Sequence, residues 1–132
     1  MKTLVTLAES VLSAPGAPTI FHHTVIPPTG SNGPRINLTW SRPQQENGII
    51  RSYNLMYSNN EYPESAVHTE IIGPSTFTYL VDVLGGVTYQ FYVRAVTIKP
   101  GENASLHVVI PEYGRFGNKF CDYCIALFYL GS

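Results

Sequence analysis

The segment Arg35-Ile36-Asn37-Leu38-Thr39-Trp40 decides the fold that the sequence predicts. Apolar and polar residues alternate along it, so Ile36, Leu38 and Trp40 share one face of a β-strand. Trp40 is the only tryptophan of the chain, and a buried indole is a large apolar group that needs packing partners around it. We therefore expect this strand to face a core that a second sheet closes.

Six other short runs have the composition of strands and are separated by residues that favour turns. They are Thr19–Ile26, Ile50–Tyr57, Val67–Ile72, Phe77–Val83, Tyr89–Val96 and Ser105–Ile110. No run shows a helical period. Seven short strands at this spacing predict an all-β fold, a seven-stranded antiparallel immunoglobulin-like β-sandwich.

The inward faces of three of these strands supply the expected core. Alternation is clearest in the sixth strand, where Tyr89, Phe91 and Val93 share a face. The expected core residues are Ile36, Leu38, Trp40, Tyr53, Leu55, Tyr89, Phe91 and Val93.

Composition limits the classes of partner. With 132 residues the chain is long enough for one domain with its own core. Charged residues make up 13% of the chain and the formal net charge is −1, with basic residues scattered. A nucleic-acid surface needs clustered Lys and Arg, so we expect no nucleic-acid partner. No run approaches the ~20 apolar residues of a membrane span, and Glu9 interrupts the apolar run after Lys2 too early for a convincing signal peptide.

Four patterns carry a family resemblance. They are Pro15-Gly16-Ala17-Pro18, Ile36-x-Leu38-x-Trp40-x-x-Pro43, Asn47-Gly48-x-Ile50-x-x-Tyr53-x-Leu55-x-Tyr57 and Thr88-Tyr89-x-Phe91-x-Val93-x-Ala95. Together they resemble a fibronectin type III module from about Pro15 to Ile110. The resemblance implies a domain over residues 15–111. Residues 1–14 are then a linker or the end of a preceding module, and residues 112–132 a C-terminal tail, which we expect to be flexible.

The resemblance also implies a role for Tyr89, which looks like the family's tyrosine corner, a tyrosine whose hydroxyl bonds to the backbone of the preceding turn. The family has a buried leucine before this turn. Here either Val83 fills that position, or Leu84 fills it with a one-residue deletion. The sequence leaves both registers open.

The sequence offers no convincing catalytic, cofactor-binding or metal-binding set. His22 and His23 are adjacent, so on a strand they point to opposite faces. Cys121-Asp122-Tyr123-Cys124 has the spacing of a redox motif or half a zinc site, but no further ligands or thioredoxin-type helix are visible nearby. We therefore expect free thiols, no cofactor, no metal and no enzyme activity.

Two N-glycosylation sequons are present, Asn37-Leu38-Thr39 and Asn103-Ala104-Ser105. Asn37 falls on the face opposite Trp40 and Asn103 falls in a turn, so we expect both to be exposed. With the family resemblance, they favour an extracellular setting, as the ectodomain of a membrane protein if the chain is a fragment.

These features lead to a hypothesis about function. The chain is expected to be a non-catalytic extracellular module that acts as a spacer and as a protein–protein interaction surface. Its expected partners are an unknown protein and neighbouring modules of the same kind. The resemblance implies a fragment of a tandem-module receptor or adhesion protein, such as a receptor-type tyrosine phosphatase. The alternative is an accessory or carbohydrate-binding module of a secreted enzyme, for which Tyr57, Tyr62 and Tyr92 are the candidate stacking residues.

The tail ends in an apolar stretch, Phe120–Leu130, that contains Asp122 and is too short to cross a bilayer. Pro111, Gly114 and Gly117 interrupt regular structure before it. The stretch alternates too poorly for an added surface strand, so we expect the tail to lie outside the sandwich, flexible or loosely docked.

Overall fold

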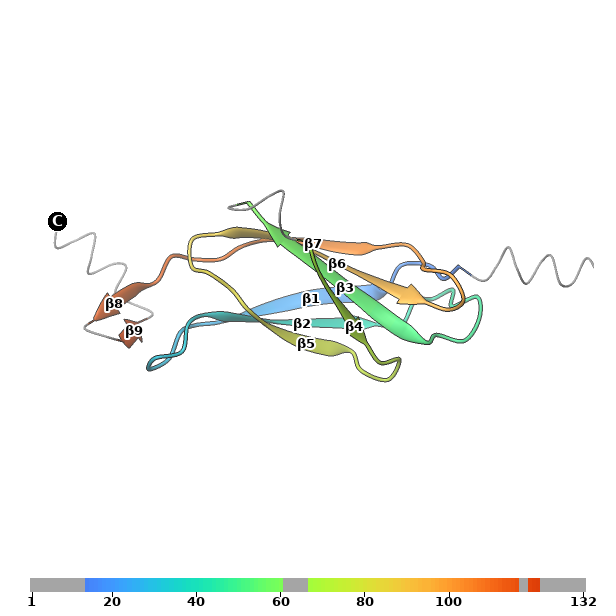
Figure 1. The fold of residues 1–132 in the computed structure, drawn as a ribbon, viewed down its shortest axis with the longest axis horizontal. Helices are drawn as coiled ribbons and strands as arrows, with labels where there is room; N and C mark the ends of the chain where they lie inside the picture. The colour runs from blue at the N-terminus through green and yellow to red at the C-terminus, as the bar shows by residue number, and fades with distance from the viewer. Residues whose placement is uncertain (1–13, 61–66, 117–118, 122–132) are drawn as a thin grey trace, which may run out of the picture.

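The structure is a computed structural model that describes residues 14–60, 67–116 and 119–121. Among these residues, seven strands form two antiparallel sheets (Figure 1). The three-stranded sheet has the order β1 (Thr19–Ile26), β2 (Arg35–Ser41), β5 (Thr78–Asp82). The four-stranded sheet has the order β4 (His68–Ile72), β3 (Ser52–Asn59), β6 (Thr88–Val96), β7 (Ala104–Val109). The all-β sandwich prediction is confirmed.

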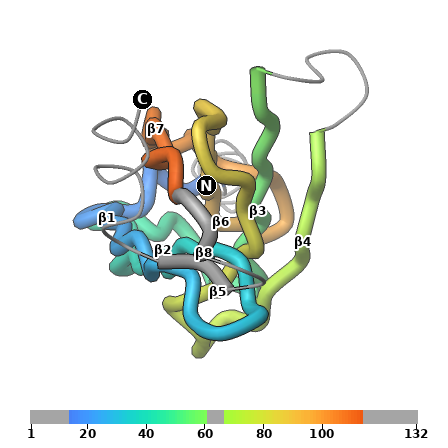
Figure 2. The backbone as a smooth tube through the Cα atoms, turned by 90° about the vertical axis from the view of Figure 1, so that its left-hand side faces the viewer, coloured from blue at the N-terminus to red at the C-terminus, as the bar shows by residue number. Residues whose placement is uncertain are grey.

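The two sheets face each other across one core, as the view along the strands shows (Figure 2). Alternation in the sequence sets which side chains enter it. β2 and β6 alternate strictly between buried and half-buried residues along their whole lengths. The eight side chains assigned to the core from the sequence are each at most 4% exposed. Ile50 is also buried, although it lies before β3 rather than within it.

Trp40 lies between the two sheets. Its ring meets Phe21 of β1 edge-on, with centroids 6.4 Å apart, and Tyr53 of β3 at 5.8 Å. Tyr53 in turn meets Phe77 at 5.7 Å. Aromatic pairs in these geometries add to the stabilisation that burial alone gives. A series of aromatic rings therefore connects the three-stranded sheet to the four-stranded sheet.

β1 is irregular near its start, which the sequence did not indicate. Its pairing with β2 shifts register between Thr19 and His22. Within this bulge Ile20 has φ 51° and is 64% exposed. A positive φ is unusual for a β-branched residue. Bulges are frequent on edge strands, where they bend the strand and break up its free hydrogen-bonding edge.

The turn before β6 shows which register the chain adopts. The Tyr89 hydroxyl accepts a hydrogen bond from the Leu84 backbone N–H at 2.9 Å. Val83 is buried, whereas Leu84 is 54% exposed. Val83 therefore fills the core position before the turn, without a deletion. The bond satisfies a backbone donor of the turn, so Tyr89 joins the core and the loop through one side chain.

The start of the tail contains two short strands, which the sequence did not indicate. Gly114–Phe116 (β8) and Lys119–Cys121 (β9) form an antiparallel pair of their own, which adds no strand to either sheet of the sandwich. This pair contacts none of the seven sandwich strands. Tyr113, before it, packs against the core. The rest of the tail lies outside the described residues.

Two buried tyrosines give a matched test of the hydroxyl in the turn. Tyr89→Phe removes the partner of the Leu84 N–H, so we expect unfolding in urea to cost about 1–3 kcal/mol less. The Tyr53 hydroxyl is buried and makes no hydrogen bond to the described protein groups. Tyr53→Phe should therefore leave stability unchanged or raise it slightly. Equal losses from both variants would refute the distinction.

The same variants should differ from the wild type in alkali. Burial raises the pKa of both Tyr53 and Tyr89 in the folded protein. The unfolded chain then releases these protons at lower pH than the folded chain, near pH ~10. The stability that the two protonated tyrosines contribute is thus complete below that pH, and it is lost as the pH rises through the raised pKa values of the folded protein. Each Phe variant should show a shallower alkaline loss of stability in urea titrations.

Candidate functional site

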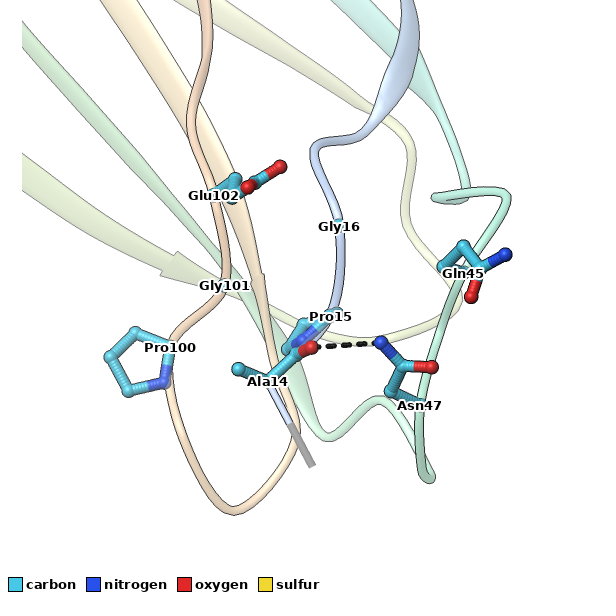
Figure 3. Close-up of a pocket in the computed structure, with 8 residues that line it drawn as sticks. All are labelled: Ala14, Pro15, Gly16, Gln45, Asn47, Pro100, Gly101 and Glu102. Atoms are coloured by element: carbon cyan, nitrogen blue, oxygen red, sulfur yellow. Dashed lines mark hydrogen bonds between the residues drawn. The ribbon is translucent and has the colours of Figure 1, made fainter. Parts of the chain in front are cut away.

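Three segments that lie far apart in the sequence meet at one pole of the sandwich. They are the incoming segment 14–16, the loop between β2 and β3, and the loop between β6 and β7. Together they line an open hollow of about 420 Å³ (Figure 3). Its lining residues are Ala14, Pro15, Gly16, Gln45, Asn47, Pro100, Gly101 and Glu102.

Hydrogen bonds hold the incoming segment from both sides. The Gly16 N–H donates to the Gln45 carbonyl at 2.8 Å, and Asn47 Nδ2 donates to the Ala14 carbonyl at 3.0 Å (Figure 3). From the opposite loop, the Glu102 N–H donates to the Pro15 carbonyl at 3.2 Å. Pro15 is fully buried. The direction in which the chain enters the sandwich is therefore fixed by both loops.

Two residue types make this arrangement possible. Asn47 has φ 53°, a left-handed conformation that Asn tolerates better than most residues. Gly101 lies against Pro15: a Cβ placed there would overlap the Pro15 carbonyl oxygen and lie 2.6 Å from Pro15 Cγ. Glycine is required here for the close approach of two backbones.

The surface around the hollow is mixed in character. Ile49 is 84% exposed and Ile98 is 63% exposed, one on each of the two loops. Arg42 and Glu46 form an exposed ion pair at 3.3 Å, which contributes little to stability. Glu102 is the one carboxylate among the lining residues. Exposed apolar side chains beside amide and backbone groups suit contact with another protein.

The histidines and cysteines do not gather into a site. Among the described residues, no group of three or more His, Cys, Asp or Glu lies close enough to hold a metal ion. His22 and His23 are exposed on β1. His68 stacks on Tyr57 at 5.1 Å, and His107 Nδ1 lies 3.0 Å from Gln90 Oε1. Cys121 ends β9, while Cys124 lies outside the described residues.

The two sequons have different surroundings. Asn103 is exposed and directly precedes β7. Asn37 is half-buried in the middle strand of its sheet, and its Oδ1 accepts a hydrogen bond from Thr78 Oγ1 at 3.0 Å. Asn37 is thus less exposed than we expected, although it lies on the outer face.

The expected carbohydrate-stacking residues do not form one surface. Tyr57 packs on the core side, with its ring 5.6 Å from that of Phe91. Tyr92 alternates with the buried residues of β6, so it lies on the outer face of the same sheet. Tyr62 lies outside the described residues.

The segments that line the hollow are recognisable in the sequence, but their proximity in space is not. Pro15-Gly16-Ala17-Pro18 and Asn47-Gly48 belong to the patterns of the family resemblance, and Asn103 is expected in a turn. In a sandwich the loop after the second strand and the loop before the last strand can share a pole with the start of the chain. Combining the expected fold with the turn positions could have predicted the site.

The fold and these features agree with known proteins. The model of the fibronectin type III domain family matches residues 17–109. The chain belongs to the fibronectin type III family. Fibronectin type III modules of solved structures are also similar: the FN1-FN3 domains of chicken CNTN1 give a TM-score of 0.60 at 13% identity, covering 74% of this chain and 31% of that one. The FN5 domain of Drosophila Lar gives 0.55 at 20% identity, covering 74% and 98%. At these identities the likeness shows the fold alone.

Curated relatives are longer proteins. Protein sidekick-2 of Gallus gallus is 35% identical over 109 residues, covering 74% of this chain and 5% of that protein. Ephrin type-B receptor 2 of Coturnix japonica is 31% identical over 107 residues, covering 81% of this chain and 9% of that receptor. The chain thus spans less than a tenth of either relative. Within the described part of the chain, no helix has the length and hydropathy that a transmembrane span needs.

Gly101 provides a test of the close approach at the pole. Gly101→Ala forces a methyl group against the Pro15 backbone, so we expect a loss of about 1–3 kcal/mol in urea unfolding. Gly73→Ala is the matched control, because no atom lies within 4 Å of the added Cβ and its φ is not positive. The pole geometry is wrong if both variants unfold at the same urea concentration.

Proposed function

We propose that this fibronectin type III module acts outside the cell as a spacer and as a protein-interaction surface. The observation that carries the proposal is the path of the chain. It enters the sandwich at one pole near Ala14 and leaves at the opposite pole near Tyr113 (Figure 1). Modules joined through such ends extend one after another rather than folding back.

The held incoming segment supports the spacer role. Its hydrogen bonds to Gln45, Asn47 and Glu102 restrain how a preceding module could rotate against this one. The exposed Ile49 and Ile98 stand where such a module would make contact. A neighbouring module of the same kind is therefore the first expected partner, and the receptor among the relatives is consistent with a cell-surface setting.

The alternative, an accessory or carbohydrate-binding module of a secreted enzyme, has less support. It requires exposed aromatic rings on one surface, whereas Tyr57 and Tyr92 lie on opposite faces of the four-stranded sheet. Fibronectin type III folds are typically non-catalytic, and the proposal includes no catalytic step.

Backbone dynamics test the spacer role. We expect ¹⁵N relaxation to give the amides of Ala14 and Gly16 order parameters near ~0.85, the value of rigid backbone. Asn47→Gly tolerates the positive φ but removes the side chain that bonds to Ala14, so the order parameter of Ala14 should fall. Asn32→Gly, in an exposed turn, is the control and should change neither amide.

Values below ~0.6 at Ala14 and Gly16 in the wild type would mean a flexible joint. That result would remove the proposed basis for a stiff spacer, whatever the variants show.

Glycan occupancy tests the extracellular setting. We expect protein secreted from mammalian cells to carry a glycan at Asn103, because this residue is exposed beside a loop. Occupancy at Asn37 should be lower, because the residue is half-buried and its amide oxygen is bonded to Thr78. Mass spectrometry after enzymatic deglycosylation in heavy-oxygen water measures both. Secreted protein with neither site converted would contradict the proposed route.

A further inference from the structure

The outer face of the four-stranded sheet carries apolar side chains beside one cationic side chain. We call it the open face and define it by Ile71 of β4, Asn54 and Met56 of β3, and Tyr92 and Arg94 of β6. All five alternate with residues that enter the core, so their side chains point away from it. Ile71 is 77% exposed, and the other four are half-buried.

The strand register brings these residues into two adjacent rows. Asn54 pairs with Ile71 on one side and with Arg94 on the other. Met56 pairs with Tyr92. Directly opposed residues in antiparallel strands have Cβ atoms about 4.5–5.5 Å apart. Arg94 therefore lies within one compact patch with Ile71, Met56 and Tyr92.

Arg94 has no carboxylate partner among the described residues. It forms no ion pair with any described carboxylate, and its Nε is buried without a hydrogen-bond partner. Its neighbour across the strand pair is Asn54. The outward positions of β3, β4, β6 and β7 contain no Asp or Glu. Glu70 of β4 pairs with the buried Leu55 and lies on the core side of the sheet.

The other sheet provides an internal comparison. Arg35 of β2 is also half-buried with an unpartnered Nε, but it lies opposite Asp82 of β5. Arg35 thus has a carboxylate at its cross-strand position, whereas Arg94 has the neutral Asn54 at the position paired with it on β3. The sequon Asn37 also lies on the outer face of this other sheet, and neither sequon lies on the open face.

We propose that the open face binds a protein partner that presents a carboxylate, surrounded by apolar side chains, to Arg94. Tyr, Met and Arg are the residue types enriched in protein interfaces. Ile71 and Tyr92 would pack around an ion pair between Arg94 and the partner's carboxylate and would partly exclude water from it. The ion pair would also fix the orientation of the partner. This inference deepens the interaction part of the proposed function and rests on it.

Charge also argues against two other occupants. A nucleic acid or sulfated glycan is held by several cations, and Arg94 is the one Lys or Arg among the outward residues of these strands. A second copy docked face to face by two-fold symmetry would bring two Arg94 side chains together with no carboxylate between them. A different protein with an acidic centre is the occupant that fits.

A phage-displayed library of random peptides, selected on the whole 132-residue chain, is the probe. We expect the enriched peptides to contain Asp or Glu beside apolar residues. Added as synthetic peptides, they should shift the NMR resonances of Met56, Tyr92 and Arg94. Peptides that lack a carboxylate, peptides that shift only residues elsewhere, or a selection without any binder would overturn the proposal.

Matched variants give the quantitative test. Arg94→Gln should weaken binding of the selected peptides at least about tenfold, and Arg35→Gln should change it less than about twofold. Thermal unfolding of both variants checks that they remain folded. Equal effects of the two substitutions would also overturn the proposal.

Other outcomes separate this inference from the proposed function. Peptides that shift only the NMR resonances of Ile49 and Ile98 would support an interaction module, but its binding surface would be the pole and not the open face. If the chain self-associates in sedimentation, and if Ile71→Ser abolishes this self-association while Arg94→Gln leaves it unchanged, the occupant of the open face is a second copy of the chain. Either result rejects the open face as the site of an acidic partner.

Discussion

The packing of one indole ring determines the arrangement of the whole sandwich. Trp40 contacts Phe21 within its own sheet and Tyr53 in the opposite sheet. Each such aromatic side chain buries about 150–250 Å², so the three rings form a large part of the core. A slip of β2 by one residue would turn Trp40 to solvent, together with Ile36 and Leu38. The register of the sheets is therefore fixed by the cost of exposing these side chains.

The same register determines the outer surfaces of both sheets. Because side chains alternate along a strand, every residue that enters the core fixes its neighbours on the outside. Burial of Phe91 and Val93 directs Tyr92 and Arg94 outward beside Met56 and Asn54. Burial of Ile36 and Leu38 directs Asn37 outward on the other sheet. The core thus determines which polar groups are accessible on the two outer faces.

The sequence predicts the fold where the signal is local. Alternation in Arg35–Trp40 and in Tyr89–Val96 is sufficient to assign strands and their inward faces. It could not decide between Val83 and Leu84, because both are apolar and only the position of the Tyr89 hydroxyl distinguishes them. The bulge at Ile20 has no sequence signal, since isoleucine normally favours a regular strand. The hollow joins segments about thirty to ninety residues apart, which no local pattern reports. The charge of Arg94 becomes informative only when the neighbours on two other strands are known.

The path of the chain from one pole to the other has a mechanical consequence. A pulling force on the two ends acts along β1 and β7, nearly parallel to the strands, rather than across them (Figure 1). The hydrogen bonds between β1 and β2, and between β6 and β7, are then loaded in shear and share the force instead of breaking one at a time. The regular part of the β1–β2 pairing is confined to His22–Ile26, since the register shifts before it. Resistance to stretching should therefore rest on those few residues together with the hydrogen bonds that hold the incoming segment 14–16.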